Sequence, residues 1–250
     1  DHDPCGLKLL RGKTVVGRRS LHPDALALEI NQRIVDHVAR FHRELAGRVV
    51  VLFAEINRLK AVFGNRHRGQ DGIDLAHFAP DVVAPTDAPA PLIVFTGQMD
   101  YTPNIEAVTA FTKNVLPLVM KAVPDAVFAI VGRAPTIAVK SLEAHKVIVT
   151  GEVPDTRPWL AAASVVVAPL RIARGVQNKV LEAMAMGKAC VVSSGAATGI
   201  DAIDGEDFIV SDDPAAAVIA FLRNPGLSEA IGKNARTKMV ARYSWETQLA

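Results

Sequence analysis

The second part of the chain alternates short apolar runs with stretches of helical periodicity. Continuous apolar runs of this kind are typical of strands that are covered on both faces of a sheet. They fall at 92–96, 127–131, 147–150, 165–168 and 189–193. Helical patterns begin near Pro103 and lie near 159–163, 214–222 and 227–243. This alternation predicts an α/β fold with a doubly wound parallel sheet.

Residues 175–187 carry a pattern of their own. At helical period they are apolar on nearly every side, which predicts a helix buried among other elements. Asn178 and Glu182 lie one turn apart on one face, with Lys179 beside them in the first turn. A helix N-terminus has unpaired N–H groups and a positive dipole end, so we expect a phosphate there. The carboxylate one turn deeper would accept hydrogen bonds from sugar hydroxyls. The ordinary alternative is a Lys179–Glu182 ion pair on a solvated face.

Glycines follow several of the predicted strands. Gly97, Gly132, Gly151 and Gly175 all lie just past strand ends, and Arg133 follows the second of them. A single glycine there is more often only a turn. In open parallel sheets, however, ligands bind beyond the carboxyl ends of the strands. Four glycines in such places predict one shared site at one rim of the sheet.

The amino-acid composition of the chain changes before residue 92. Residues 84–91 form a Pro/Ala linker, which predicts a domain boundary. Upstream of this linker, the pattern predicts helices at 25–45 and 55–63 and a strand at 49–53. We therefore expect residues 1–83 and 92–250 to belong to two different domains. Because the chain opens at Asp1 without Met, we expect a fragment or a trimmed protein.

Composition excludes several classes of function. The net charge of +2 at pH 7 is too mild to indicate nucleic acid, and half of the 250 residues are hydrophobic. No apolar run approaches the roughly 18 residues of a membrane span. The two cysteines favour thiols in a reducing cytoplasm. Nucleophile elbows, phosphate loops and zinc spacings are absent from the sequence, so we expect a phosphate-and-sugar site without metal or cofactor.

The motifs described so far resemble a known family. From about Leu92 to the C-terminus the chain is similar to retaining glycosyltransferases of the GT-B fold, of the glycosyltransferase group 1 (GT4) type. The resemblance rests on 169–188 (PLRIARGVQNKVLEAMAMGK) above all, with TGQMDYTPN at 96–104, IVGR at 130–133, VTGEV at 149–153 and RYSWE at 242–246. The variants at 99–104 and 174–182 look most like the sugar transferases of bacterial exopolysaccharide and PEP-CTERM protein-sorting systems. Residues 72–80 resemble the passage that ends the acceptor domain of this family. The resemblance therefore implies that residues 1–83 are the remnant of a first Rossmann-like domain and that 92–250 are a complete second one.

The resemblance implies an activity and partners. It implies transfer of a sugar from a UDP- or GDP-linked donor to a glycan or lipid-linked acceptor in cell-surface polysaccharide synthesis. No metal is implied, and the location would be cytoplasmic, with peripheral contact to the inner membrane. Glu182 would bind the donor ribose and Lys179 the diphosphate, with Asn178 on the diphosphate or the sugar. Further candidates are Arg133 and Arg171 for the diphosphate charge, Gly97 and Gly175 at the strand ends, and Gly151 and Val153 against the base.

Some positions depart from the family pattern. Arg174 stands where many relatives have the first of two glutamates, and Gln98 and Pro103 stand where basic residues are expected. No residue matches the family's histidine near the reacting centre, so the catalytic residue, the base, the sugar and the acceptor are left unassigned. Two alternatives stay open, a GT-B-fold sugar-nucleotide epimerase and a truncated module that binds a sugar nucleotide without catalysis.

Overall fold

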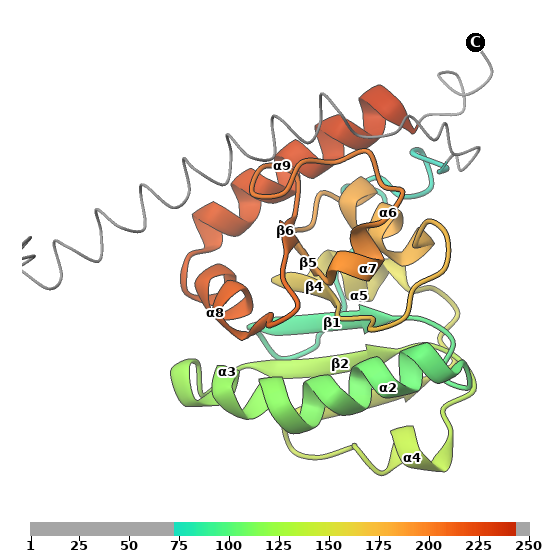
Figure 1. Ribbon diagram of the computed structural model, residues 1–250, viewed down its shortest axis with the longest axis vertical. Helices are drawn as coiled ribbons and strands as arrows, with labels where there is room; N and C mark the ends of the chain where they lie inside the picture. The colour runs from blue at the N-terminus through green and yellow to red at the C-terminus, as the bar shows by residue number, and fades with distance from the viewer. Residues whose placement is uncertain (1–72, 244–250) are drawn as a thin grey trace, which may run out of the picture. The chain divides into compact units, whose positions relative to one another are not determined.

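Six parallel strands form the centre of the structure, a computed structural model that describes residues 73–243 (Figure 1). The strands are β1 (Leu92–Thr96), β2 (Val127–Val131), β3 (Val147–Gly151), β4 (Val165–Ala168), β5 (Cys190–Val192) and β6 (Ile209–Val210). Their order in the sheet is β3-β2-β1-β4-β5-β6. The chain therefore reverses its direction of winding between β1 and β4, which confirms the predicted doubly wound parallel sheet. Ligand sites of such sheets lie at this reversal, beyond the carboxyl ends of the strands.

The central strands are apolar because both of their faces are covered. All five residues of β1 and all five of β2 are buried, and the two strands pair in register from Leu92 opposite Val127 to Thr96 opposite Val131. The runs predicted at 92–96, 127–131 and 165–168 are confirmed residue for residue. The run at 189–193 is longer than the strand within it, since β5 comprises only Cys190–Val192.

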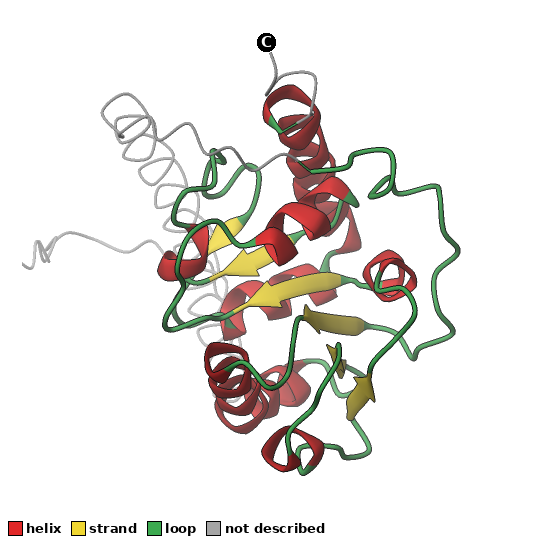
Figure 2. Ribbon diagram, turned by 90° about the vertical axis from the view of Figure 1, so that its right-hand side faces the viewer, coloured by secondary structure: helices red, strands yellow, loops and turns green. Residues whose placement is uncertain are grey.

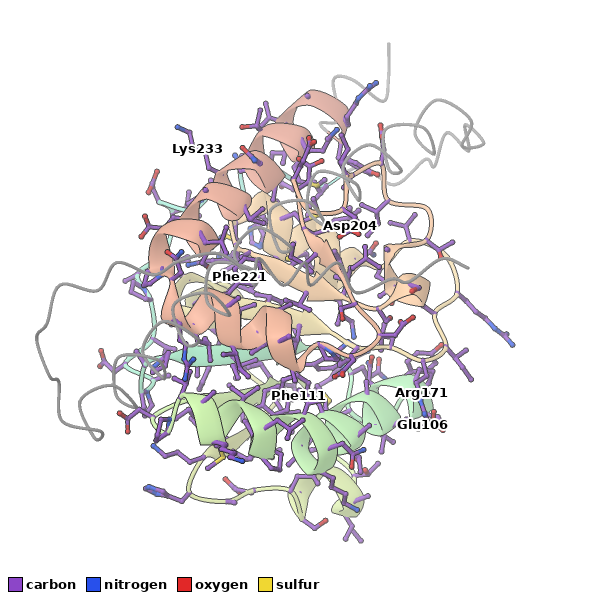
Figure 3. The ribbon with its side chains drawn as sticks, turned by 60° about the vertical axis from the view of Figure 1, so that its left-hand side comes forward. Glu106, Phe111, Arg171, Asp204, Phe221 and Lys233 are labelled. Atoms are coloured by element: carbon purple, nitrogen blue, oxygen red, sulfur yellow. The ribbon has the colours of Figure 1, made fainter. Side chains whose placement is uncertain are left out.

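Helices lie on both sides of the sheet (Figure 2). They are α2 (Thr102–Ala110), α3 (Leu116–Ala122), α4 (Ile137–Lys140), α5 (Arg157–Ala162), α6 (Asn178–Ala185), α7 (Ser194–Ala197), α8 (Ala215–Arg223) and α9 (Pro225–Arg242). A π-helical turn, η1 (Phe111–Val115), joins α2 to α3. Helix α3 packs against α8, and α6 packs against α9. Phe111 and Phe221 are among the buried residues of these layers (Figure 3).

The helical patterns of the sequence correspond to α2, α5, α8 and α9. Pro103 lies in the first turn of α2, and the bounds of the other three differ from the prediction by one or two residues. Helices α4 and α7 were not predicted, because each has only one turn. A hydroxyl caps the N-terminus of each of these two helices. The side chain of Thr136 accepts a hydrogen bond from the backbone N–H of Val139, and that of Ser193 accepts one from the backbone N–H of Ala196.

The first described residues are attached to the C-terminal helix. The backbone N–H of Ile73 donates to the carbonyl oxygen of Tyr243 at 3.1 Å. The guanidinium of Arg236 donates to the carbonyl oxygens of Phe78 and Leu75 at 3.0 and 3.1 Å. The patterns at 25–45, 49–53 and 55–63 lie outside the described residues, and the division into 1–83, 84–91 and 92–250 stays a prediction. Among residues 73–243, no helix combines the length and the apolar character needed to cross a bilayer.

Candidate functional site

An open cleft of about 500 Å³ lies at the carboxyl ends of the strands. Its walls come from the segments that follow β1, β2 and β3 and from the N-terminus of α6. The lining residues are Thr96, Gly97, Gln98, Tyr101, Asn104, Gly132, Arg133, Glu152, Val153, Thr156, Val176, Gln177, Asn178, Lys179 and Glu182. The cleft is thus built where a doubly wound sheet places its ligands.

Two glycines that line the cleft let the segments after β1 and β2 touch. A Cβ atom added to Gly132 would overlap the carbonyl oxygen of Gly97. One added to Gly97 would lie 2.8 Å from Nδ2 of Asn104 and 2.9 Å from Nζ of Lys179, closer than real Cβ atoms come. A side chain at either position would separate the two loops or push the amide and the ammonium group out of place. Close approach to the backbone therefore requires glycine at Gly132, whereas at Gly97 the groups that would have to move are the Asn104 amide and the Lys179 ammonium.

The N-terminus of α6 points its first residues into the cleft. Gln177 is the N-cap residue, but its side chain makes no cap hydrogen bond to the helix. Its amide donates instead to the carbonyl oxygens of Arg174 and Gly175, at 3.3 and 3.1 Å. No side chain caps this end among the described residues, so the positive end of the helix dipole faces the cleft without a protein partner. Asn178 is exposed there.

Lys179 reaches across the cleft to the segment after β1. Its Nζ atom donates to Oδ1 of Asn104 at 2.6 Å and lies 4.1 Å from the ring centroid of Phe95. Asn104 is itself buried and anchored, because its Nδ2 atom donates to the carbonyl oxygen of Gln98 at 2.8 Å. Among the ion pairs of residues 73–243 there is none between Lys179 and Glu182. The alternative of a Lys179–Glu182 ion pair is therefore not what the structure shows.

Burial shifts the pKa values of this lysine and carboxylate in opposite directions. Desolvation lowers the pKa of Lys179 to about 7, and the nearby charge of Glu182 opposes that shift only in part. Desolvation likewise raises the pKa of Glu182, while the charges of Lys179 and His77 lower it. Both groups are thus poorly solvated without being paired at short range. A ligand that brings negative charge to Lys179 and hydroxyl donors to Glu182 would relieve both.

The remaining candidates of the sequence divide into two groups. Arg133 lines the cleft, where its Nη2 atom donates to Oε1 of Gln98 at 2.9 Å, and Val153 lines the wall that follows β3. Gly151, Arg171 and Gly175 are not among the lining residues. Gly151 ends β3, Gly175 precedes the cleft residue Val176, and Arg171 is exposed on the loop after β4 (Figure 3).

The structure therefore brings six of the predicted residues to one cleft: Gly97, Arg133, Val153, Asn178, Lys179 and Glu182. Their role in binding a nucleotide stays a prediction. Sequence reasoning did not include Gln98, Tyr101 and Asn104 as site residues, although all three line the cleft. Asn104 lies in the first turn of α2, where a buried amide needs hydrogen-bond partners. Among the described residues, no group of three or more His, Cys, Asp or Glu could hold a metal ion.

Comparison with known proteins identifies the family of the chain and proteins of similar fold. A family model described as Glycosyl transferases group 1 matches residues 90–224. No curated protein matches the chain. Among solved structures, sucrose-phosphate synthase from Thermosynechococcus elongatus is 21% identical, with a TM-score of 0.56, over 71% of this chain and 48% of its own. Anabaena HepE, solved in complex with UDP and glucose, is 16% identical, with a TM-score of 0.54, over 71% of this chain and 52% of its own.

A third structure is a single domain. The C-terminal domain of a glycosyl transferase group 1 family protein (LpcC) from Francisella tularensis is 18% identical, with a TM-score of 0.56, and is covered over its whole length by 70% of this chain. The chain spans about half of the sucrose-phosphate synthase and HepE structures. At these identities the likeness concerns the fold, which is that of GT-B glycosyltransferases.

Proposed function

The chain belongs to the family of group 1 glycosyl transferases, and from this we propose that it transfers a sugar from a UDP- or GDP-linked donor to a glycan or lipid-linked acceptor. The transfer would retain the anomeric configuration and would serve exopolysaccharide or other cell-surface polysaccharide synthesis, as in the PEP-CTERM-associated subgroup. It would take place in the cytoplasm, in peripheral contact with the inner membrane, without a metal.

One observation carries this proposal. A cation and a carboxylate, one turn apart on α6, lie poorly solvated in a cleft at the carboxyl ends of β1, β2 and β3. Breaking the anomeric bond of a sugar nucleotide places negative charge on the leaving diphosphate. A fixed cation at that point is the largest contribution that a protein can make to such a step. Lys179 is suited to that charge, and Glu182 can accept hydrogen bonds from the ribose hydroxyls.

Other features support the donor class. The uncapped end of α6 favours an anion, and the wall after β3, with Val153, offers an apolar surface to a base. The HepE structure holds UDP and glucose, which supports a uridine nucleotide as the first ligand to test. An epimerase would share the fold but would need acidic and histidine groups for proton abstraction at the sugar. Glu182 and Glu152 are the acidic residues that line the cleft, and no histidine lines it among the described residues.

Binding of a nucleoside diphosphate tests the proposal. By calorimetry we expect UDP or GDP to bind with a Kd in the micromolar to millimolar range. Replacing Glu182 by Ala should weaken binding by about 1–3 kcal/mol, because hydrogen bonds from the ribose to a charged acceptor are lost. Glu106→Ala is the matched control, since Glu106 is exposed on α2 and does not line the cleft.

Two results would contradict the proposal. If neither UDP nor GDP binds, the cleft is not a donor site. If Glu182→Ala and Glu106→Ala bind as tightly as the unchanged protein, Glu182 does not belong to the site. Incubation of the protein with UDP-glucose, followed by NMR of the sugar, separates the epimerase, because only an epimerase would change the configuration of a ring carbon without an acceptor.

A further inference from the structure

Two basic residues line the cleft, Arg133 and Lys179. Each donates a hydrogen bond to a neutral amide side chain of the segment after β1, Arg133 to Gln98 and Lys179 to Asn104. We propose that Gln98 is a positioning residue that orients Arg133 toward the donor diphosphate. Arg133 and Lys179 would then hold the two phosphates from two different elements of the fold. This inference rests on the proposed function, because it concerns how the same cleft holds the leaving group.

The backbone fixes where Arg133 can be. The pairing of β1 with β2 continues past the strand ends, where the N–H of Gly97 donates to the carbonyl oxygen of Val131 at 3.0 Å. One step further, the N–H of Met99 donates to the carbonyl oxygen of Arg133 at 2.8 Å. Since Gly132 has no Cβ, the two loops touch at this point. The position of Arg133 relative to Gln98 is therefore set by main-chain contacts and not by the side chains alone.

The residue after Arg133 has an unusual backbone. Ala134 has φ of 56°, and it is the only residue other than glycine with positive φ in the described part of the chain. An alanine in the left-handed region is strained, so the surrounding structure must impose this conformation. Such strain is concentrated at functional sites. Here the strained residue lies between the cleft residue Arg133 and α4.

The side chain of Gln98 completes the arrangement. Its Oε1 atom accepts from Nη2 of Arg133 at 2.9 Å, while its carbonyl oxygen accepts from Nδ2 of Asn104 at 2.8 Å. Asn104 in turn accepts from Nζ of Lys179 at 2.6 Å. Gln98 therefore contacts Arg133 directly through its side chain and Lys179 indirectly, through Asn104. A neutral amide restrains a cation without cancelling its charge, whereas a carboxylate at this position would compete with a phosphate.

Arg133 keeps the capacity to bind phosphate in this arrangement. A guanidinium has five N–H donors, and the bond to Gln98 uses one of them. The other donors can form the paired hydrogen bonds that arginine makes with phosphate oxygens. Arg133 is exposed, so without Gln98 its long side chain would sample many rotamers. The amide thus reduces the ordering that a ligand would otherwise have to impose.

The test compares nucleoside diphosphates with nucleosides. Calorimetry is carried out with UDP and uridine, and with GDP and guanosine. We expect Arg133→Ala to weaken binding of the diphosphate about 10–150-fold, the range of a hydrogen bond to a charged group, and to change binding of the nucleoside by less than about two-fold. Gln98→Met keeps the shape of the side chain but removes the acceptor. It should weaken binding of the diphosphate about 3–10-fold, because the ligand must then order the long side chain of Arg133. Lys140→Ala, an exposed charge on α4 outside the cleft, is the charge-matched control and should have no effect.

A double-mutant cycle shows whether Gln98 acts through Arg133. If it does, adding Gln98→Met to Arg133→Ala should change diphosphate affinity by less than about two-fold. A purely structural role of Gln98 would instead give the same loss in both backgrounds and would lower the melting temperature.

The outcomes distinguish failure of the proposed function from failure of the role inferred for Gln98. If the unchanged protein binds neither UDP nor GDP, the proposed function and this inference fail together. If it binds one of them and Arg133→Ala keeps the diphosphate-over-nucleoside preference, only this inference is overturned. It is also overturned if Gln98→Met weakens binding equally with and without Arg133, because Gln98 would then act independently.

Discussion

At the scale of single residues, the state of Lys179 is set by neutral partners. An amide oxygen and an aromatic ring contact its ammonium group, and neither carries the full negative charge that would offset burial. Desolvation therefore lowers its pKa from the ordinary 10.5 to about 7. In the unfolded chain the lysine keeps its proton up to the ordinary value. The energetic cost of burying the cation is thus fully present below about pH 7, and it is lost as the pH rises from there toward 10.5.

A bound diphosphate should reverse this shift, since an opposite charge nearby favours the ammonium form. We expect UDP or GDP binding at pH 8 to take up a fraction of a proton, and the affinity to fall as the pH rises from 7.5 to 8.5. The fall should approach, but not exceed, about ten-fold per pH unit for one proton. Calorimetry in two buffers with different ionisation enthalpies measures the uptake directly. This pH range lies above the pKa of the ligand's own terminal phosphate, about 6.

Lys179→Arg is the matched control for the titration. A guanidinium stays charged throughout this pH range, so the variant should show neither proton uptake nor pH dependence. Lys179→Met should lose much of the preference for the diphosphate over the nucleoside. Equal affinity of the unchanged protein at pH 7.5 and 8.5, without proton uptake, would show that Lys179 does not meet the diphosphate.

At the scale of elements, the sequence predicted the sheet better than the site. Strands such as β1 and β2 could be predicted because burial on both faces imposes a continuous apolar run. The contact of Lys179 with Asn104 could not be predicted from the sequence. The two residues are 75 positions apart and meet only after β1 and β4 have paired. Periodicity placed Glu182 near Lys179 as a possible ion pair. It gave no indication that a buried amide from α2 would take the ammonium group instead.

The position of α6, and with it the cleft, depends on a close contact with α9. A Cβ atom at Gly232 of α9 would overlap the carbonyl oxygen of Gly187, which follows α6. Arg236, one turn further along α9, donates to the carbonyl oxygen of Ala185 at 2.8 Å. The two helices therefore approach at main-chain distance, and the first residues of α6 inherit their position from this contact.

Gly232→Ala should therefore destabilise the protein. We expect a loss of about 1–3 kcal/mol in the free energy of unfolding, because backbone atoms cannot give way as a flexible side chain can. Denaturant unfolding measures this. Gly226→Ala is the matched control on the same helix, since its Cβ atom would have Asn224 as nearest neighbour, at an ordinary 3.6 Å. It should be neutral or slightly stabilising. Equal stability of both variants would mean that α9 can shift away from α6 without cost.

At the scale of the whole molecule, the proposed transfer needs more than the cleft that the described residues form. Residues 90–224 match the family and the cleft lies within them, but the chain spans about half of the sucrose-phosphate synthase and HepE structures. Donor binding needs only the cleft. Transfer also needs an acceptor hydroxyl held within reacting distance of the sugar. Holding the two reactants together in this way can account for about 7–11 kcal/mol of a barrier.

We therefore expect the 250-residue chain to bind donor nucleotide without appreciable transfer. Release of UDP or GDP from the sugar nucleotide is measured with and without polysaccharide or lipid-linked acceptors. The comparison is a longer chain that restores any coding sequence ahead of Asp1, in which closure of a second domain over the cleft would exclude water and bring the acceptor to the sugar. Acceptor-dependent release by the 250-residue chain would contradict this expectation. It would mean that an acceptor site lies within these 250 residues.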